Sequence, residues 1–159
     1  MNEQRRLVLK AGGSLGVLAL AYAAGLIQPV AAVAAVAAEW NQTAFAGKSL
    51  DEVLAAFGGS APTESKDIDI TAPDIAENGA VVPITIESKL AKTQAISLLV
   101  EKNPSALSSH FELPEGTDPY VMTRVKMGQT SHVVALVKAD GKFFFARREI
   151  KVTLGGCGG

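Results

Sequence analysis

Apolar and polar residues alternate with a period of two along most of the chain from Lys66 onward. The alternation is clear in Ile68–Thr71, Val82–Glu87 and Val121–Met127, and it is typical of strands that bury one face and expose the other. A denser apolar run, Ala95–Val100, indicates a strand buried on both faces. This pattern restricts the second half of the chain to packed β-sheets.

Turn residues separate these runs, and Asp140-Gly141 is the strongest turn signal. It predicts a two-residue β-hairpin that joins Ser131–Lys138 to Lys142–Val152. Pro83 lies inside another run and predicts an edge or a bulge there, because proline cannot donate a ladder hydrogen bond. About seven short strands at this spacing predict an all-β fold, an immunoglobulin-like antiparallel β-sandwich. The chain has one cysteine, so this sandwich lacks the disulfide of antibody domains.

One short helix is expected before the strands. Ser49 and Glu52 have the spacing of a capping box, in which the hydroxyl accepts from the Glu52 amide and the Glu52 side chain reaches back. The helix ends near Phe57, because Gly58-Gly59 is a stop signal. Asp51 and Glu52 therefore belong to the start of a helix and are not a catalytic carboxylate pair.

The first 37 residues predict a signal peptide that is cleaved. Arg5-Arg6 precedes the uncharged stretch Ala11–Ala38, which contains an Ala-x-Ala site at Ala35–Ala37. The paired arginines resemble a twin-arginine signal. The alternative is an uncleaved membrane anchor, but Gln28-Pro29 interrupts the apolar stretch. The sequence thus predicts a periplasmic protein that is exported by the twin-arginine pathway and has no membrane contact after cleavage.

Removal of residues 1–37 leaves a weakly acidic protein. Three of the 15 basic residues and one of the 16 acidic residues lie in that segment, so 12 basic and 15 acidic residues remain. Without a basic run, nucleic-acid binding is not expected. The expected organisation is an N-terminal segment with the short helix at 38–65, a β-sandwich domain at 66–153 and a carrier arm at 154–159.

The single cysteine, Cys157, lies in a glycine-rich ending. Glycine has no side chain to bury and is costly to order, so this ending predicts a flexible, swinging arm with a thiol. From Leu154 to Cys157 an extended arm covers roughly 10 Å. An exposed thiol has a pKa near ~8.5, and residues 152–159 contain no Lys, Arg or His to lower it. The arm therefore predicts a covalent carrier without catalytic residues, formed by Cys157 and the four flanking glycines, Gly155, Gly156, Gly158 and Gly159.

Two alternatives remain open for this ending. Cys157 could form an inter-chain disulfide in a structural or interaction module, since an exported chain with an unpaired cysteine often pairs with another chain. The terminal Gly158-Gly159 is also similar to that of ubiquitin-like sulfur carriers, which are charged at the carboxylate. Those carriers act in the cytoplasm, and the export signal argues against them.

No metal site and no cofactor are predicted. The two histidines, His110 and His132, fall in separate predicted strands without a ligand cluster and are interpreted as strand-surface residues. Phe143–Phe145 is interpreted mainly as core, with a partner-docking stripe as the alternative. Arg147-Arg148 and Lys151 are interpreted as solvated strand faces that could orient an anionic partner.

Three features together resemble the SoxY family of the bacterial thiosulfate-oxidising Sox system. They are the paired arginines, the stretch A-E-N-G-A-V-V-P at 76–83 and the ending V-T-L-G-G-C-G-G at 152–159. The resemblance covers essentially the whole chain, and the terminal G-G-C-G-G is its most specific element.

The resemblance implies a periplasmic immunoglobulin-like sandwich that pairs with a second β-sandwich protein, SoxZ, as a heterodimer or a heterotetramer. It implies that Cys157 carries the sulfur substrate and that transient contacts present it to three enzymes. A haem enzyme (SoxAX) conjugates thiosulfate to the thiol, a hydrolase (SoxB) releases sulfate, and a sulfane dehydrogenase (SoxCD) oxidises the remaining sulfur.

Overall fold

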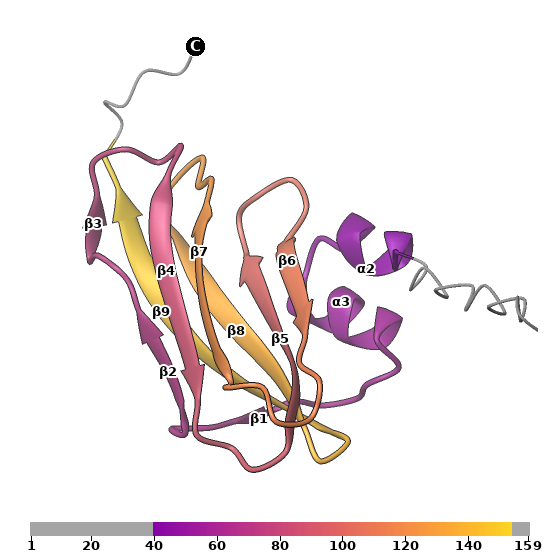
Figure 1. The fold of residues 1–159 in the computed structure, drawn as a ribbon. Coiled ribbons are helices and arrows are strands. Elements are labelled where there is room, and N and C mark those ends of the chain that lie inside the picture. Colours follow the sequence, from indigo (N-terminus) through magenta and orange to yellow (C-terminus); the bar gives the residue numbers. More distant parts are fainter. Residues whose placement is uncertain (1–39, 154–159) are drawn as a thin grey trace, which may run out of the picture. The chain divides into compact units, whose positions relative to one another are not determined.

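Two β-sheets packed face to face form the body of the protein in a computed structural model that describes residues 40–153 (Figure 1). The larger sheet has the strand order β1 (Thr63–Glu64), β9 (Lys142–Val152), β8 (Ser131–Ala139), β5 (Thr93–Val100) and β6 (Leu107–Glu112), and β3 (Ile75–Ala76) also pairs with β9. The smaller sheet has the order β2 (Ile68–Thr71), β4 (Val82–Ser88) and β7 (Tyr120–Val125). This arrangement is the predicted immunoglobulin-like β-sandwich.

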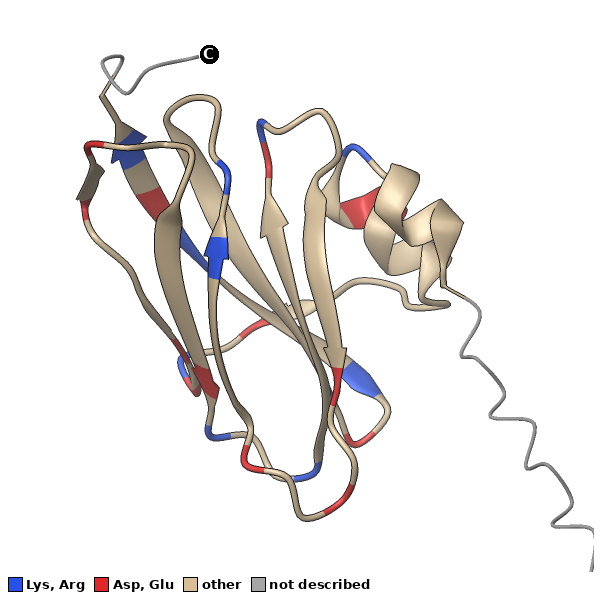
Figure 2. Ribbon diagram, turned by 45° about the horizontal axis from the view of Figure 1, so that its top comes forward, with Lys and Arg blue, Asp and Glu red and all other residues tan. Residues whose placement is uncertain are grey.

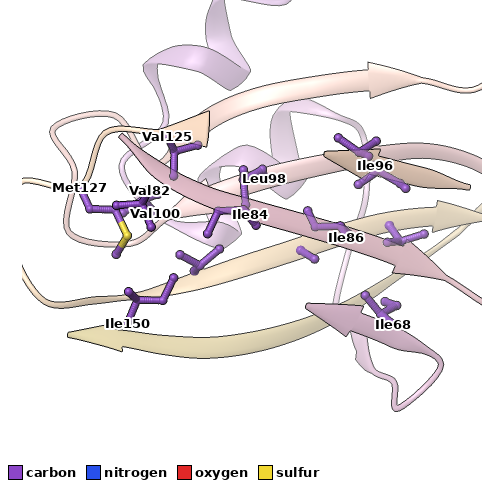
Figure 3. Close-up of a cluster of buried hydrophobic side chains, with 14 of the residues drawn as sticks. Ile68, Val82, Ile84, Ile86, Ile96, Leu98, Val100, Val125, Met127 and Ile150 are labelled. Carbon is purple, nitrogen blue, oxygen red and sulfur yellow. The ribbon is translucent and has the colours of Figure 1, made fainter. Parts of the chain in front are cut away.

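The core between the sheets consists of the inward residues of each alternating strand. In β4 every second residue is buried, and these side chains face β5 and β8 (Figure 3). The core side chains that are at most 1% exposed include Val82, Ile84, Ile86, Ile96, Leu98, Val100, Val133, Ala135, Val137 and Ile150. The period-two pattern in the sequence therefore corresponds to this single inter-sheet layer.

The opposite face of the larger sheet is buried as well. Leu99 of β5 and Val134 and Leu136 of β8 pack against Val53 and Leu54, which belong to the helix after residue 49. β5 and β8 are thus covered on both faces, which confirms the prediction for Ala95–Val100. The protein has three layers, with helices, the larger sheet and the smaller sheet in that order.

The predicted helix is α3 (Leu50–Ala56), and its start has the predicted cap. The Ser49 hydroxyl accepts from the Glu52 amide at 3.2 Å. The Glu52 carboxylate reaches back one residue further than expected and accepts from the Lys48 amide at 2.8 Å. That bond still satisfies a free amide at the helix start.

A second helix, α2 (Gln42–Ala46), precedes it, so the expectation of one helix is wrong. Asn41 caps α2 by accepting from the Ala44 amide at 3.0 Å, and its Nδ2 donates to the Ala56 carbonyl of α3 at 3.0 Å. A five-residue helix is too short to show a 3.6-residue apolar period, which explains why the sequence did not reveal it. Among residues 40–153, no helix is long and apolar enough to cross a membrane.

The hairpin and proline predictions are confirmed. Asp140 and Gly141 have φ angles of 47° and 74°, as the two central residues of a type I′ turn require. Ala139 pairs with Lys142 across that turn. Pro83 lies in the middle strand of the smaller sheet, but β2 ends at Thr71, opposite Thr85. β4 is therefore a local edge at Pro83, where only β7 lies beside it.

Two short strands add parallel pairing to the predicted antiparallel fold. The seven longer strands pair antiparallel throughout. β1 and β3, with two residues each, pair in parallel with β9. β1 lies within the expected N-terminal segment 38–65, so the larger sheet begins before Lys66. Both short strands hold the chain against the last strand of the fold.

Gly79 provides a test of the packing around the end of β9. A Cβ at this position would meet the Met127 carbonyl oxygen and lie 2.9 Å from Val152 Cγ1. We expect Gly79→Ala to lower the free energy of unfolding by about 1–3 kcal/mol, because a backbone carbonyl cannot move aside cheaply. The measurement is urea unfolding. Gly128→Ala is the matched control, since a Cβ there meets nothing within 4 Å, and it should change stability by less than about 0.5 kcal/mol.

Candidate functional site

The end of β9 is the point from which the C-terminal residues leave the fold. The Val152 amide donates to Thr130 Oγ1 at 3.0 Å, and the Thr153 amide donates to the Ala76 carbonyl at 3.2 Å. Val152 is half-buried and packs against the inter-sheet core. The backbone is therefore held by the sandwich up to Thr153, the last described residue.

The loop between β3 and β4 packs against this end of β9 (Figure 1). The Gly79 carbonyl accepts from the Met127 amide at 2.7 Å, and Asn78 Oδ1 accepts from the Ala80 amide at 2.9 Å. Only glycine leaves room for the Met127 carbonyl and the Val152 side chain at this position. The Asn78-Gly79 turn is thus a close contact between the loop and the exit of the chain.

Two parts of the sequence that carry the family resemblance meet here. The stretch 76–83 and the ending 152–159 are about 70 residues apart in sequence, yet Ala76 binds Thr153 and Gly79 approaches Val152. The dipeptide Asn78-Gly79 is a turn signal in the sequence. The glycine after the asparagine indicates a tight turn, but nothing in the sequence indicates which strand this turn contacts.

The predicted attachment residue lies outside the described residues. This holds for Cys157 and for the four glycines of the arm, Gly155, Gly156, Gly158 and Gly159. It also holds for the predicted twin-arginine signal at 1–37. The structure shows the contacts that hold the chain at Thr153, the residue before the predicted arm.

A hollow of about 370 Å³ lies on the helix side of the larger sheet, between α3 and the start of β5. His110 of β6 lines it, and its Nδ1 shares a hydrogen bond with the Ser97 hydroxyl at 2.8 Å. The imidazole stacks on Phe57 with the ring centroids 4.7 Å apart. Burial lowers the pKa of His110, and nearby Lys138 acts in the same direction, whereas Glu112 raises it. Sequence reasoning missed this contact, because a serine and a histidine on separate strands carry no spacing signal.

The second histidine, His132, lies on β8 with its Nδ1 3.5 Å from a Glu101 carboxylate oxygen. The two histidines do not share a site. Within residues 40–153, no group of three or more His, Cys, Asp and Glu side chains could hold a metal ion. Basic and acidic residues are mixed over the described strands and loops (Figure 2).

The three phenylalanines of β9 serve the core on both faces of the sheet. Phe144 packs against the inter-sheet cluster, whereas Phe143 and Phe145 pack against the cluster under the helices. Lys138 Nζ lies 5.8 Å from the Phe143 ring centroid, and Arg147 lies 5.1 Å from that of Phe145. The interpretation as core is confirmed, with cations over the half-buried outer rings.

The neighbouring arginines differ in environment. Arg147 is exposed, as expected for a solvated strand face. The same interpretation is wrong for Arg148, which donates to the Ile70 carbonyl at 3.1 Å and to Asp74 Oδ1 at 2.8 Å. Arg148 ties β2 and the segment that follows it to β9, a contact between parts of the chain about 75 residues apart. No local pattern predicts this contact. Lys151 is exposed near the end of β9.

His110 makes stability depend on pH. Its pKa is lowered in the folded protein, so below about pH 6.5, where an unfolded histidine takes up a proton, the unfolded state binds more protons. We expect the urea midpoint to fall between about pH 7.5 and 5.5, and His110→Gln to reduce this fall. His132→Gln is the control and should retain it. An unchanged acid response in His110→Gln would contradict the assignment.

The chain matches a known protein family. Residues 53–157 match the family described as sulfur oxidation protein SoxY. Among solved structures, the sulfur carrier protein SoxY from Chlorobium limicola f thiosulfatophilum is 40% identical, with a TM-score of 0.61, and the match covers 67% of this chain and 97% of that one. Comparison with curated protein sequences finds no match.

A superoxide reductase (neelaredoxin) from Ignicoccus hospitalis is similar at a lower level. It is 18% identical, with a TM-score of 0.49, over 54% of this chain and 80% of that one. The SoxY match, by contrast, spans most of the described sandwich and extends to Cys157, so its range includes the stretch 76–83 and residues 152–157 of the ending. The chain therefore belongs to the SoxY family.

Proposed function

We propose that this protein is a non-catalytic periplasmic sulfur carrier that holds thiosulfate-derived intermediates covalently on Cys157. The observation that carries the proposal is the family match over residues 53–157, which includes this cysteine. The 40% identical protein from Chlorobium is a sulfur carrier. Cys157 is the only cysteine of the chain, so it is the one thiol available for the bond.

The chemistry of the ending supports a carrier rather than a catalyst. Only a thiolate is nucleophilic, and a catalytic cysteine normally has a base or cation held against it. Residues 152–159 supply neither. The enzyme that receives the arm must therefore provide the groups that activate the thiol. Glycine on both sides of Cys157 leaves a slim chain that a narrow cleft can admit.

Because the chain is fixed up to Thr153, Cys157 can deliver its cargo only over a short distance from that residue. The backbone is hydrogen-bonded up to Thr153, and Cys157 is four residues further on. Whatever conformation these residues take, the two Cα atoms lie at most about 14 Å apart, at about 3.3–3.6 Å per residue. The carrier thus has to bring its body close to each enzyme, and the arm covers only the last step.

The reaction steps implied by the family balance without a redox group on the carrier. Conjugation joins the outer sulfur of thiosulfate to the cysteine sulfur, releases the thiol proton and removes two electrons. A SoxAX-like haem enzyme would take up these two electrons. Hydrolysis by a SoxB-like enzyme then adds water across the bond to the sulfonate group, releases sulfate and leaves a persulfide on Cys157. A SoxCD-like enzyme, where present, oxidises that remaining sulfur.

Export and partnership complete the proposal. The twin-arginine pattern at residues 5–6 supports export in the folded state. A SoxZ-like β-sandwich subunit is the stable partner, in a heterodimer or a heterotetramer. The alternative function is a structural module in which Cys157 forms an inter-chain disulfide.

Intact-mass measurement of protein from thiosulfate-grown cells tests the carrier proposal. We expect an adduct on Cys157 that a reductant removes, because the cargo is held through a sulfur–sulfur bond. Cys157→Ser should never show the adduct, while its unfolding curve stays unchanged. Unmodified thiol alone during active turnover would refute the proposal.

Two further variants separate the alternatives. Deletion of Gly158 and Gly159 should leave the adduct in place, because the thiol and not the terminal carboxylate carries the cargo. A purely structural role predicts instead a covalent dimer on non-reducing gels, with thiosulfate oxidation intact after Cys157 is blocked.

A further inference from the structure

The short reach of the arm determines where an enzyme must touch the carrier. Cys157 stays within about 14 Å of Thr153, and an enzyme that encloses the thiol in a cleft uses part of that distance for the depth of the cleft. The mouth of the cleft then lies against the residues that surround Thr153. The described structure identifies these residues, because Thr153 is hydrogen-bonded to Ala76 at the end of β3.

Two exposed aliphatic side chains flank this exit. Ile75 of β3 pairs in register with Lys151 of β9 and is 55% exposed. Val81 is 51% exposed and lies two residues after Gly79, the residue that approaches Val152. The next residue after each, Ala76 and Val82, is buried. The alternation along the chain thus points Ile75 and Val81 away from the core.

The exposure of these two side chains is not needed for the fold. Neither belongs to the inter-sheet cluster or the cluster under the helices. Ile75 adjoins Ala76, which binds Thr153, and Val81 lies two residues after Gly79, which approaches Val152, so each is close to the exit. Apolar side chains with a polar, charged surround, here Lys151, are common in protein contact sites. We define the arm-root collar as Ile75, Val81 and Lys151.

We propose that the arm-root collar is the docking surface for the enzymes that act on the cargo of Cys157. The enzyme surface that binds the collar is the rim of its active-site cleft. This rim is apolar where it contacts Ile75 and Val81. The inference rests on the proposed carrier function and adds the surface that each enzyme has to recognise. Because the reach is the same for every enzyme, successive enzymes use the same collar one after another.

Another pair of exposed apolar residues provides a comparison. Tyr120 and Met122 of β7 are 47% and 69% exposed. Tyr120 and the collar lie at opposite ends of β4. Tyr120 pairs with Glu87, the sixth residue of β4, whereas the collar residue Val81 directly precedes Val82, the first residue of β4. Five residues of strand separate the two ends by roughly 17 Å. Tyr120 is therefore a comparably exposed site on the smaller sheet, far from the exit of the arm.

The experiment uses the mature protein in complex with its partner subunit. The thiosulfate-conjugating haem enzyme and thiosulfate are added, and the Cys157 adduct is followed by intact mass at several carrier concentrations. We expect the double variant Ile75→Glu, Val81→Glu to lower kcat/KM about tenfold or more, through a raised KM with kcat unchanged. Tyr120→Glu should react as the wild type does. The rate of Cys157 with a small aromatic disulfide should be the same in all three.

Two measurements test whether a lower kcat/KM of the double variant comes from misfolding. Ile75→Thr with Val81→Thr keeps β-branched residues in place and should show a smaller effect in the same direction. Urea unfolding should show that all variants fold.

The outcomes separate the two proposals. No adduct on the wild type overturns the carrier function. An adduct that forms on the double glutamate variant at the wild-type rate overturns the collar alone. Loss of the partner subunit from the double variant would also overturn it, since the surface would then belong to that subunit.

Discussion

Burial of both faces of β5 and β8 is the constraint on which the rest of the structure depends. One face of these strands packs on the smaller sheet, and the other packs under α2 and α3. Each buried aliphatic side chain stabilises the fold by about 1.5–3 kcal/mol relative to an exposed one. A chain with one cysteine needs this apolar burial, because it has no internal disulfide to restrict the unfolded state.

The central position of β8 fixes β9, and β9 fixes the exit of the chain. β8 pairs with β9 over nine residue pairs, and the short strands β1 and β3 pair with β9 in parallel. Arg148 adds a bond from β9 to the segment before β3. The last strand is therefore held by contacts from several distant parts of the chain. Under the proposed carrier function, the distance that Cys157 can reach is measured from this fixed base.

Local signals predicted much of this structure. The period-two pattern indicated the alternating strands, the run Ala95–Val100 indicated a strand with two buried faces, and Asp140-Gly141 indicated the hairpin. The sequence could not predict contacts that depend on the folded register. Arg148 reaches the Ile70 carbonyl, and His110 shares a hydrogen bond with Ser97, although nothing local marks either pair. The carrier arm was predicted from composition and lies outside the described residues, whereas the contacts of Thr153 with Ala76 and of Val152 with Gly79 became visible only in the fold.

The parallel pairing of β3 with β9 has a mechanical consequence. A pull directed along the axis of β9 at Thr153 would load the hydrogen bonds between β9 and the parallel strand β3 in shear. Bonds loaded in this way share the force and have to break together, whereas a peeled hairpin opens one bond at a time. Under the proposed carrier function, the last strand is thus suited to withstand traction on the residues that follow it.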